Sequence, residues 1–164
     1  MIGAVVLAAG AATRYGRPKQ WEFLPAVLEA ITDSPLDEIV VVEGAHPLQP
    51  GFGRVVRCEN WADGPGASLR AGLDALGADV SHAVVLLADG PDLDPRAVAR
   101  LIEHRADGEI VAATYDGTRN HPVVLARSVW SRVPDEGARA FEALLVDCSD
   151  LTPPGDVDVP KATF

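Results

Sequence analysis

The sequence predicts an α/β domain in which a mainly parallel, Rossmann-like sheet lies between two layers of helices, a three-layer α/β/α arrangement. Short apolar runs, several of them continuous rather than alternating, predict strands that are buried on both faces. These runs alternate along the chain with amphipathic segments, which indicates βαβ crossovers. A length of 164 residues is typical of one domain, so we expect a single domain over residues 1–164.

The apolar runs give the positions of the predicted strands. They lie at residues 2–7, 39–42, 55–56, 83–88, 110–113 and 123–125. Several consist almost wholly of Ala, Val, Ile and Leu, which suits the interior of a parallel sheet. In such sheets ligands bind beyond the carboxyl ends of the strands, so residues that follow these runs are candidates for a site.

Apolar residues at helical spacing predict four helices between or after these strands. The stripes are Leu24, Val27, Leu28 and Ile31; Leu69, Leu73 and Leu76, on residues 66–76; Val98, Leu101 and Ile102; and Phe141, Leu144 and Leu145. The third helix has the clearest start, because Asp94 can cap it and Pro95 fits its first position.

Charge and composition exclude several classes of function. The net charge of −10 disfavours nucleic acid as a partner, and an anionic ligand needs a local cationic pocket. The two cysteines form no CxxC pair, and the four histidines show no zinc-binding spacing. No apolar run approaches the roughly 18 residues that a membrane span needs, and no secretory pattern precedes the first run. We therefore expect a cytoplasmic protein with no membrane partner.

The segment LAAGAATRYGRPKQ, residues 7–20, follows the first predicted strand. Its small residues let backbone N–H groups approach a ligand closely, and the cations Arg14, Arg17 and Lys19 follow. This combination suits a polyphosphate, although an ordinary glycine-rich turn with solvated cations is the alternative. The segment is neither a Walker A loop nor a GxGxxG dinucleotide fingerprint.

The spacing LAAG-x3-R-x-G-x-PK closely resembles the signature of MobA-like nucleotidyltransferases, which include molybdenum cofactor guanylyl- and cytidylyltransferases. Four further stretches resemble that family's motifs in the family's order: residues 60–73, 86–93, 118–125 and 155–160. The resemblance covers nearly the whole chain and implies the fold of nucleotide-diphospho-sugar transferases.

The resemblance also implies roles for individual residues. The implied nucleotide-binding residues are Leu7, Ala8, Ala9, Gly10, Arg14, Lys19, Gly66 and Ser68. The implied catalytic residues are Arg14, Lys19 and Asp89. Asp89, which ends an apolar run, and Asp158 would hold Mg²⁺, with Asp156 as the alternative to Asp158. His121 and Pro122 would lie on the acceptor side. The structural alternatives are that Ser68 caps a helix and that His121 packs in a turn.

The expected reaction is transfer of a nucleoside monophosphate from CTP or GTP to a small phosphorylated acceptor, with release of pyrophosphate. Similarity to the molybdenum cofactor enzymes makes molybdopterin the expected acceptor, and LAAG rather than LAGG is similar to the cytidylyl branch. One alternative is guanylyl transfer or nucleotide-sugar synthesis on another acceptor. A second is a nucleotide-binding protein without turnover that delivers cofactor to a molybdenum enzyme.

Overall fold

The computed structural model describes residues 1–10, 19–48 and 53–155. Of the predicted site residues, Arg14 and Asp158 lie outside these ranges, as does the alternative ligand Asp156. The backbone of Lys19 is described, and this residue begins the first helix.

A seven-stranded mixed sheet forms the centre of the molecule, in the order β3-β2-β1-β4-β6-β5-β7. The strands are β1 (Ile2–Ala8), β2 (Glu38–Glu43), β3 (Arg54–Arg57), β4 (His82–Leu87), β5 (Ile110–Tyr115), β6 (Thr118–Ala126) and β7 (Leu144–Asp147). All neighbouring pairs are parallel except those of β6, which runs antiparallel to β4 and β5. The mainly parallel sheet is therefore confirmed.

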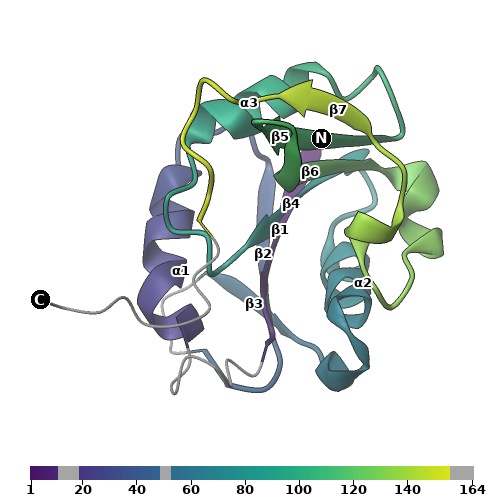
Figure 1. Cartoon of the computed structure of the whole chain (residues 1–164). Coiled ribbons are helices and arrows are strands. Elements are labelled where there is room, and N and C mark those ends of the chain that lie inside the picture. The colour runs from purple at the N-terminus through teal and green to yellow at the C-terminus, as the bar shows by residue number, and fades with distance from the viewer. Residues whose placement is uncertain (11–18, 49–52, 156–164) are drawn as a thin grey trace, which may run out of the picture.

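Helices cover both faces of the sheet, as Figure 1 shows. Helices α1 (Lys19–Ala30) and α3 (Pro95–Glu103) lie on one face, and α2 (Pro65–Ala75) lies on the other. Each face has its own cluster of buried apolar residues, one around Leu24, Leu86 and Leu101 and the other around Leu69 and Leu125. Short 3₁₀ turns at Trp61–Asp63, Arg127–Arg132 and Ala138–Ala140 complete the connections.

Helix α3 begins where the sequence predicts. The Asp94 carboxylate accepts a hydrogen bond of 2.9 Å from the backbone N–H of Arg96, and Pro95 occupies the first helical position. The stripe of Val98, Leu101 and Ile102 is buried against the sheet. The N-cap and the apolar stripe therefore both stabilise α3.

The predicted helix at Phe141, Leu144 and Leu145 is wrong. Residues Leu144–Asp147 form the edge strand β7, which pairs in parallel with β5 through Val111↔Leu144 and Thr114↔Asp147. The i, i+3, i+4 spacing of these three residues fits a helix, but the contiguous Leu-Leu-Val is also compatible with a strand. Pairing with a fully buried neighbouring strand favours the extended form.

Two local predictions also need correction. Ser68 lies inside α2, whose N-cap residue is Gly64, so Ser68 does not cap the helix. His121 and Pro122 lie within β6 rather than before it, because that strand begins at Thr118. Among the described residues, no helix is long and apolar enough to cross a membrane.

Close packing of α2 on the sheet depends on Gly72. A Cβ at this position would lie 2.4 Å from Val5 Cγ1 and 2.9 Å from Val42 Cγ2. Both valines are fully buried in adjacent strands. The absence of a side chain at residue 72 therefore sets the distance between α2 and the pair β1–β2.

We expect Gly72→Ala to lower the free energy of unfolding by up to about 2 kcal/mol. Overpacking lowers stability by roughly 1–3 kcal/mol, and the higher helix propensity of Ala offsets this loss by about 1 kcal/mol. Urea denaturation measures the change. Asp74→Ala, on the exposed side of the same helix, is the control, and an equal effect of both substitutions would contradict the packing argument.

Candidate active site

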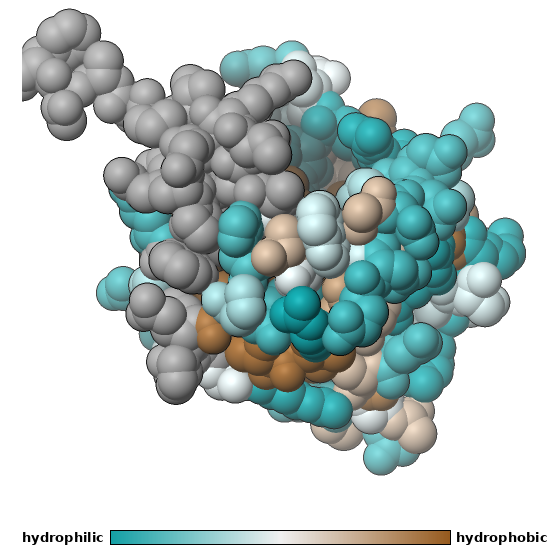
Figure 2. All heavy atoms as spheres, turned by 90° about the horizontal axis from the view of Figure 1, so that it is seen from below, coloured by the Kyte–Doolittle hydropathy of each residue, from teal (hydrophilic) through white to brown (hydrophobic). Residues whose placement is uncertain are grey.

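The candidate site lies at the carboxyl ends of the central parallel strands. Parallel pairing of Leu7 with Leu87 brings the ends of β1 and β4 to one edge of the sheet, and the Ala88 N–H donates to the Leu7 carbonyl at 3.0 Å. Residues 7–10 therefore lie beside Asp89, which follows β4. Figure 2 shows this end of the molecule, whose described surface is mainly hydrophilic with an apolar patch.

The end of β1 is also fixed from the side of β2. The Ala45 N–H donates to the Ala9 carbonyl at 3.1 Å. Between these strand ends, a Cβ on Gly44 would lie 2.8 Å from the Ala9 carbonyl oxygen and 2.7 Å from Trp61 Cβ. The half-buried Trp61 thus packs beside the predicted nucleotide-binding turn. In the sequence Trp61 precedes Gly64 by three positions, and no local pattern pairs it with Gly44.

Helix α2 begins at the same edge, and its first turn is packed against another segment of backbone. The Gly66 N–H donates to the Asp135 carbonyl at 2.8 Å. A Cβ on Gly66 would lie 1.7 Å from the Pro134 carbonyl oxygen, so only glycine fits there. Ser68, one turn from the helix start, is buried. The described contacts of Gly66 therefore give it a packing role, and its predicted contact with nucleotide stays a prediction.

His121 is a buried histidine next to Asp89. The residue is 6% exposed, and no described group forms a hydrogen bond with its Nε2. A Cβ on Gly90 would lie 2.7 Å from that nitrogen, so glycine at this position makes room for the imidazole ring. The backbone of His121 is held at both ends, since Tyr115 Oη donates to its carbonyl at 3.2 Å and its N–H donates to Asn120 Oδ1 at 2.8 Å.

Burial determines the protonation state of this histidine. It lowers the pKa of His121 to about 4, although the negative charge of Asp89 acts in the opposite direction. The ring is therefore neutral near pH 7. The Nε2 atom is itself buried beside Gly90 and has no described hydrogen-bond partner, a state that costs free energy.

The segment that follows β7 reaches the same place. The Asp92 N–H donates to the Pro154 carbonyl at 3.0 Å, and a Cβ on Gly90 would lie 3.0 Å from Pro154 Cβ. Figure 1 shows this segment running along the face of α1 and α3 toward the carboxyl ends of the strands. The described chain thus ends at Gly155, against the loop that carries Asp89.

The structure brings most of the described site residues to one edge. Leu7, Ala8, Ala9, Gly10, Asp89, His121 and Pro122 gather there, with His121 and Pro122 joined by a cis peptide bond. Gly66 and Ser68 lie in the helix that begins at that edge. Within the described ranges no group of three or more metal-ligating side chains occurs. Gly90, which the sequence analysis did not select, is needed for the packing of His121.

This topology, with its candidate site at the carboxyl ends of β1 and β4, is that of a Rossmann-like α/β domain. The sequence model of the family described as MobA-like NTP transferase domain matches residues 4–145 of this chain. The chain belongs to this family, which confirms the resemblance found in the sequence.

Solved structures with the same fold include Rv0371c from Mycobacterium tuberculosis H37Rv, with 25% identity and a TM-score of 0.79 over 97% of this chain and 94% of that one. A homologue from Mycobacterium sp. strain JC1 gives 23% identity and a TM-score of 0.79 over 96% and 90%. The 2-C-methyl-D-erythritol 4-phosphate cytidylyltransferase of Thermus thermophilus gives 18% and 0.62 over 90% and 89%. No curated protein matches the chain at a significant level.

The buried, neutral His121 predicts a specific dependence of stability on pH. The unfolded chain protonates this histidine near pH 6.5, whereas the folded chain does so only near pH 4. The unfolded state therefore binds more protons between these values, and stability falls as the pH is lowered through that window. We expect His121 to contribute a loss of about 2 kcal/mol between pH 8 and pH 5.

Urea denaturation of the wild type and of His121→Asn at both pH values measures this contribution. The variant should lose correspondingly less stability than the wild type on acidification, with the pH 8 measurement as the reference for each protein. Equal losses in the two proteins would show that the folded chain admits a proton at His121 without cost.

Proposed function

We propose that the chain is a Mg²⁺-dependent nucleotidyltransferase that moves a nucleoside monophosphate from CTP, or from GTP, to a small phosphorylated acceptor. The observation that carries this proposal is the juxtaposition of Asp89 and the unpartnered Nε2 of His121 beside the end of β1. The Asp89 carboxylate suits the metal ion of a bound triphosphate, and the His121 Nε2 suits a polar group of the acceptor.

The chemistry of the described residues is compatible with Mg²⁺. This cation usually takes one or two carboxylates from the protein and completes its octahedron with water and substrate phosphates. Asp89 supplies one carboxylate at the carboxyl end of β4, and Asp158, or Asp156, follows in sequence the segment that contacts the Asp89 loop. Rv0371c from M. tuberculosis H37Rv has been solved in complex with manganese, which supports a divalent metal.

The proposed reaction is an in-line substitution at the α-phosphorus. An oxygen of the acceptor phosphate forms a new bond to this phosphorus while the bond to the bridging oxygen of pyrophosphate breaks. When bound, Mg²⁺ neutralises part of the charge on the triphosphate. Lys19 and Arg14 offset the charge that develops on the leaving pyrophosphate. The small residues Ala8, Ala9 and Gly10, which follow Leu7, admit the nucleotide to the backbone. His121 offers its Nε2 to the acceptor.

Molybdopterin, or its molybdenum-loaded form, is the acceptor we propose, on the basis of the sequence resemblance. A molybdenum enzyme that receives the product is the corresponding partner. The cytidylyltransferase of T. thermophilus and a CMP-2-keto-3-deoxy-manno-octonic acid synthetase solved with CTP share this fold, which favours CTP over GTP as the donor.

Calorimetric titration with CTP, GTP and ATP, each with and without Mg²⁺, tests the choice of nucleotide. We expect the tightest binding for CTP with Mg²⁺ and weaker binding after chelation of the metal. A preference for GTP would move the proposal to guanylyl transfer, and absence of binding to all three would refute it. Binding without any release of pyrophosphate in the presence of molybdopterin would favour a cofactor-delivery protein.

Asp89→Asn and Lys19→Ala should each lower the rate of transfer by at least about 100-fold, the scale of losing one preorganised electrostatic contact. Pyrophosphate release measures the rate, and circular dichroism checks that each variant is folded. Asp116→Asn is the matched control, because it removes the same charge from an exposed turn where φ is 51°, a conformation that Asn tolerates. A near-normal rate in either variant removes that residue from the mechanism.

A further inference from the structure

Strand β7 is an edge strand that exposes apolar side chains on both of its faces. It pairs with β5 on one side and ends the sheet on the other. Leu144 is 41% exposed and Leu145 is 57% exposed, and successive residues of a strand point to opposite faces. We propose that the chain forms a symmetric dimer in which β7 pairs antiparallel with β7 of a second copy.

The opposite edge of the sheet is protected against such pairing, and β7 is not. Strand β3 begins and ends with arginines, and Arg54 and Arg57 form ion pairs with Glu38 and Glu43 of the neighbouring strand. Charged residues on an edge strand discourage further pairing. Strand β7 has the sequence Leu-Leu-Val-Asp, with no lysine, arginine or proline. Asp147 is its only charged residue, so the edge of β7 is the better suited of the two to strand addition.

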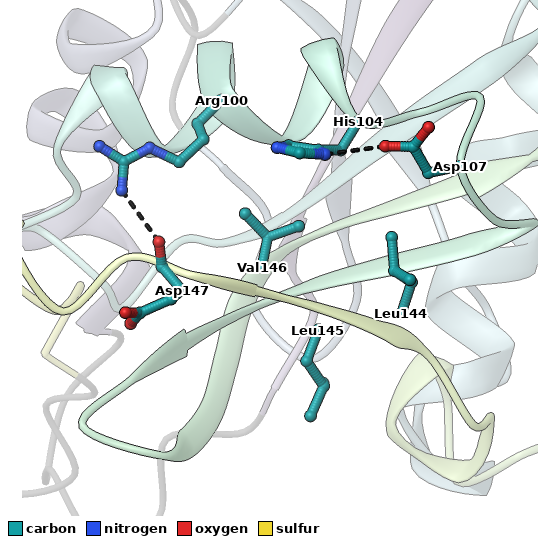
Figure 3. A pocket seen from close by; sticks show the side chains of 7 residues that line it. All are labelled: Arg100, His104, Asp107, Leu144, Leu145, Val146 and Asp147. Atoms are coloured by element: carbon teal, nitrogen blue, oxygen red, sulfur yellow. Dashed lines mark hydrogen bonds and ion pairs between the residues drawn. The ribbon is translucent and has the colours of Figure 1, made fainter.

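A hollow of about 690 Å³ lies between this strand and α3. Figure 3 shows Arg100, His104 and Asp107 on one side of the hollow and residues 144–147 on the other. The charged groups are already engaged. Arg100 bonds to Asp150 at 2.7 Å and to the Asp147 carbonyl at 3.0 Å, and His104 bonds to Asp107 at 2.8 Å. What remains for a partner is the apolar surface of β7, so we infer that the partner strand is also apolar.

The chain's own β7 meets this requirement when the two-fold axis lies at Leu145. With the two-fold axis at Leu145, that residue faces its own copy and Leu144 faces Val146 of the copy. Asp147 then faces Ala143 of the copy, so no acidic residues are directly opposite. An axis between Leu144 and Leu145 would instead place Glu142 opposite Asp147, where like charges repel.

A second copy also fits both faces of the strand. A two-fold axis perpendicular to the sheet keeps corresponding faces on the same side, so the copy continues the sheet and places its own α3 on the side where α3 already lies. The exposed Leu144 and Leu145 are then covered together by one partner. An unrelated extended peptide would bring a strand but not the second layer.

Disulfide formation at the two-fold axis tests the register. In the proposed dimer, directly opposite Cβ atoms at residue 145 lie about 4.5–5.5 Å apart, which is close enough for a Leu145→Cys variant to form an intermolecular disulfide with small adjustments. The native Cys58 and Cys148 are buried, so the wild type should not cross-link. Val55→Cys places a cysteine on the exposed edge strand β3 and is the matched control.

We expect cross-linked dimer from Leu145→Cys under mild oxidation, and little from Val55→Cys. Sedimentation should give the wild type twice the chain mass of 17.3 kDa, and Leu145→Lys should give the monomer without a change in nucleotide affinity. Cross-linking through residue 55 alone, a monomeric wild type at all concentrations, or a dimeric Leu145→Lys would each overturn the proposal.

Discussion

The parallel pairing of β1 with β4 is the constraint on which the site depends. Both strands are buried on their two faces, and their register runs from Ile2↔His82 to Leu7↔Leu87. Gly3 helps to fix that register, because a Cβ there would lie 2.8 Å from a methyl group of Leu76. A shift of one residue would bring a larger side chain against Leu76 and exchange the faces of every residue in the strand. The turn after β1 and Asp89 are therefore held at one edge.

The reversed direction of β6 adds a different kind of residue to that edge. A strand parallel to β4 would contribute residues that follow its carboxyl end, whereas β6 contributes residues from its beginning. His121 is thus part of the ladder of the sheet, with a fixed backbone, and its ring is buried against Gly90. A side chain held in this way loses little conformational entropy when it is used, which is compatible with the acceptor-side role proposed for His121.

The sequence predicts the parallel strands well, because a continuous apolar run such as residues 83–88 is typical of a strand buried on both faces in a domain of this size. It predicts α3 from its cap, and it places Asp89 from the end of an apolar run. It does not predict the direction of β6, since periodicity carries no direction, or β7, whose identity depends on pairing with β5. The packing of His121 against Gly90 joins residues 31 positions apart in the chain and depends on tertiary structure alone.

The distribution of positive charge connects the fold to the proposed chemistry. Most described arginines already contact carboxylates or backbone carbonyls: Arg54, Arg57, Arg70, Arg96, Arg100, Arg105, Arg119, Arg127 and Arg132. On a chain with a net charge of −10, an anionic nucleotide needs cations that are not used in this way. The proposed function assigns this role to Arg14 and Lys19, which follow the turn after β1 in the sequence. This local requirement explains why one short segment carries the strongest functional signal in the sequence.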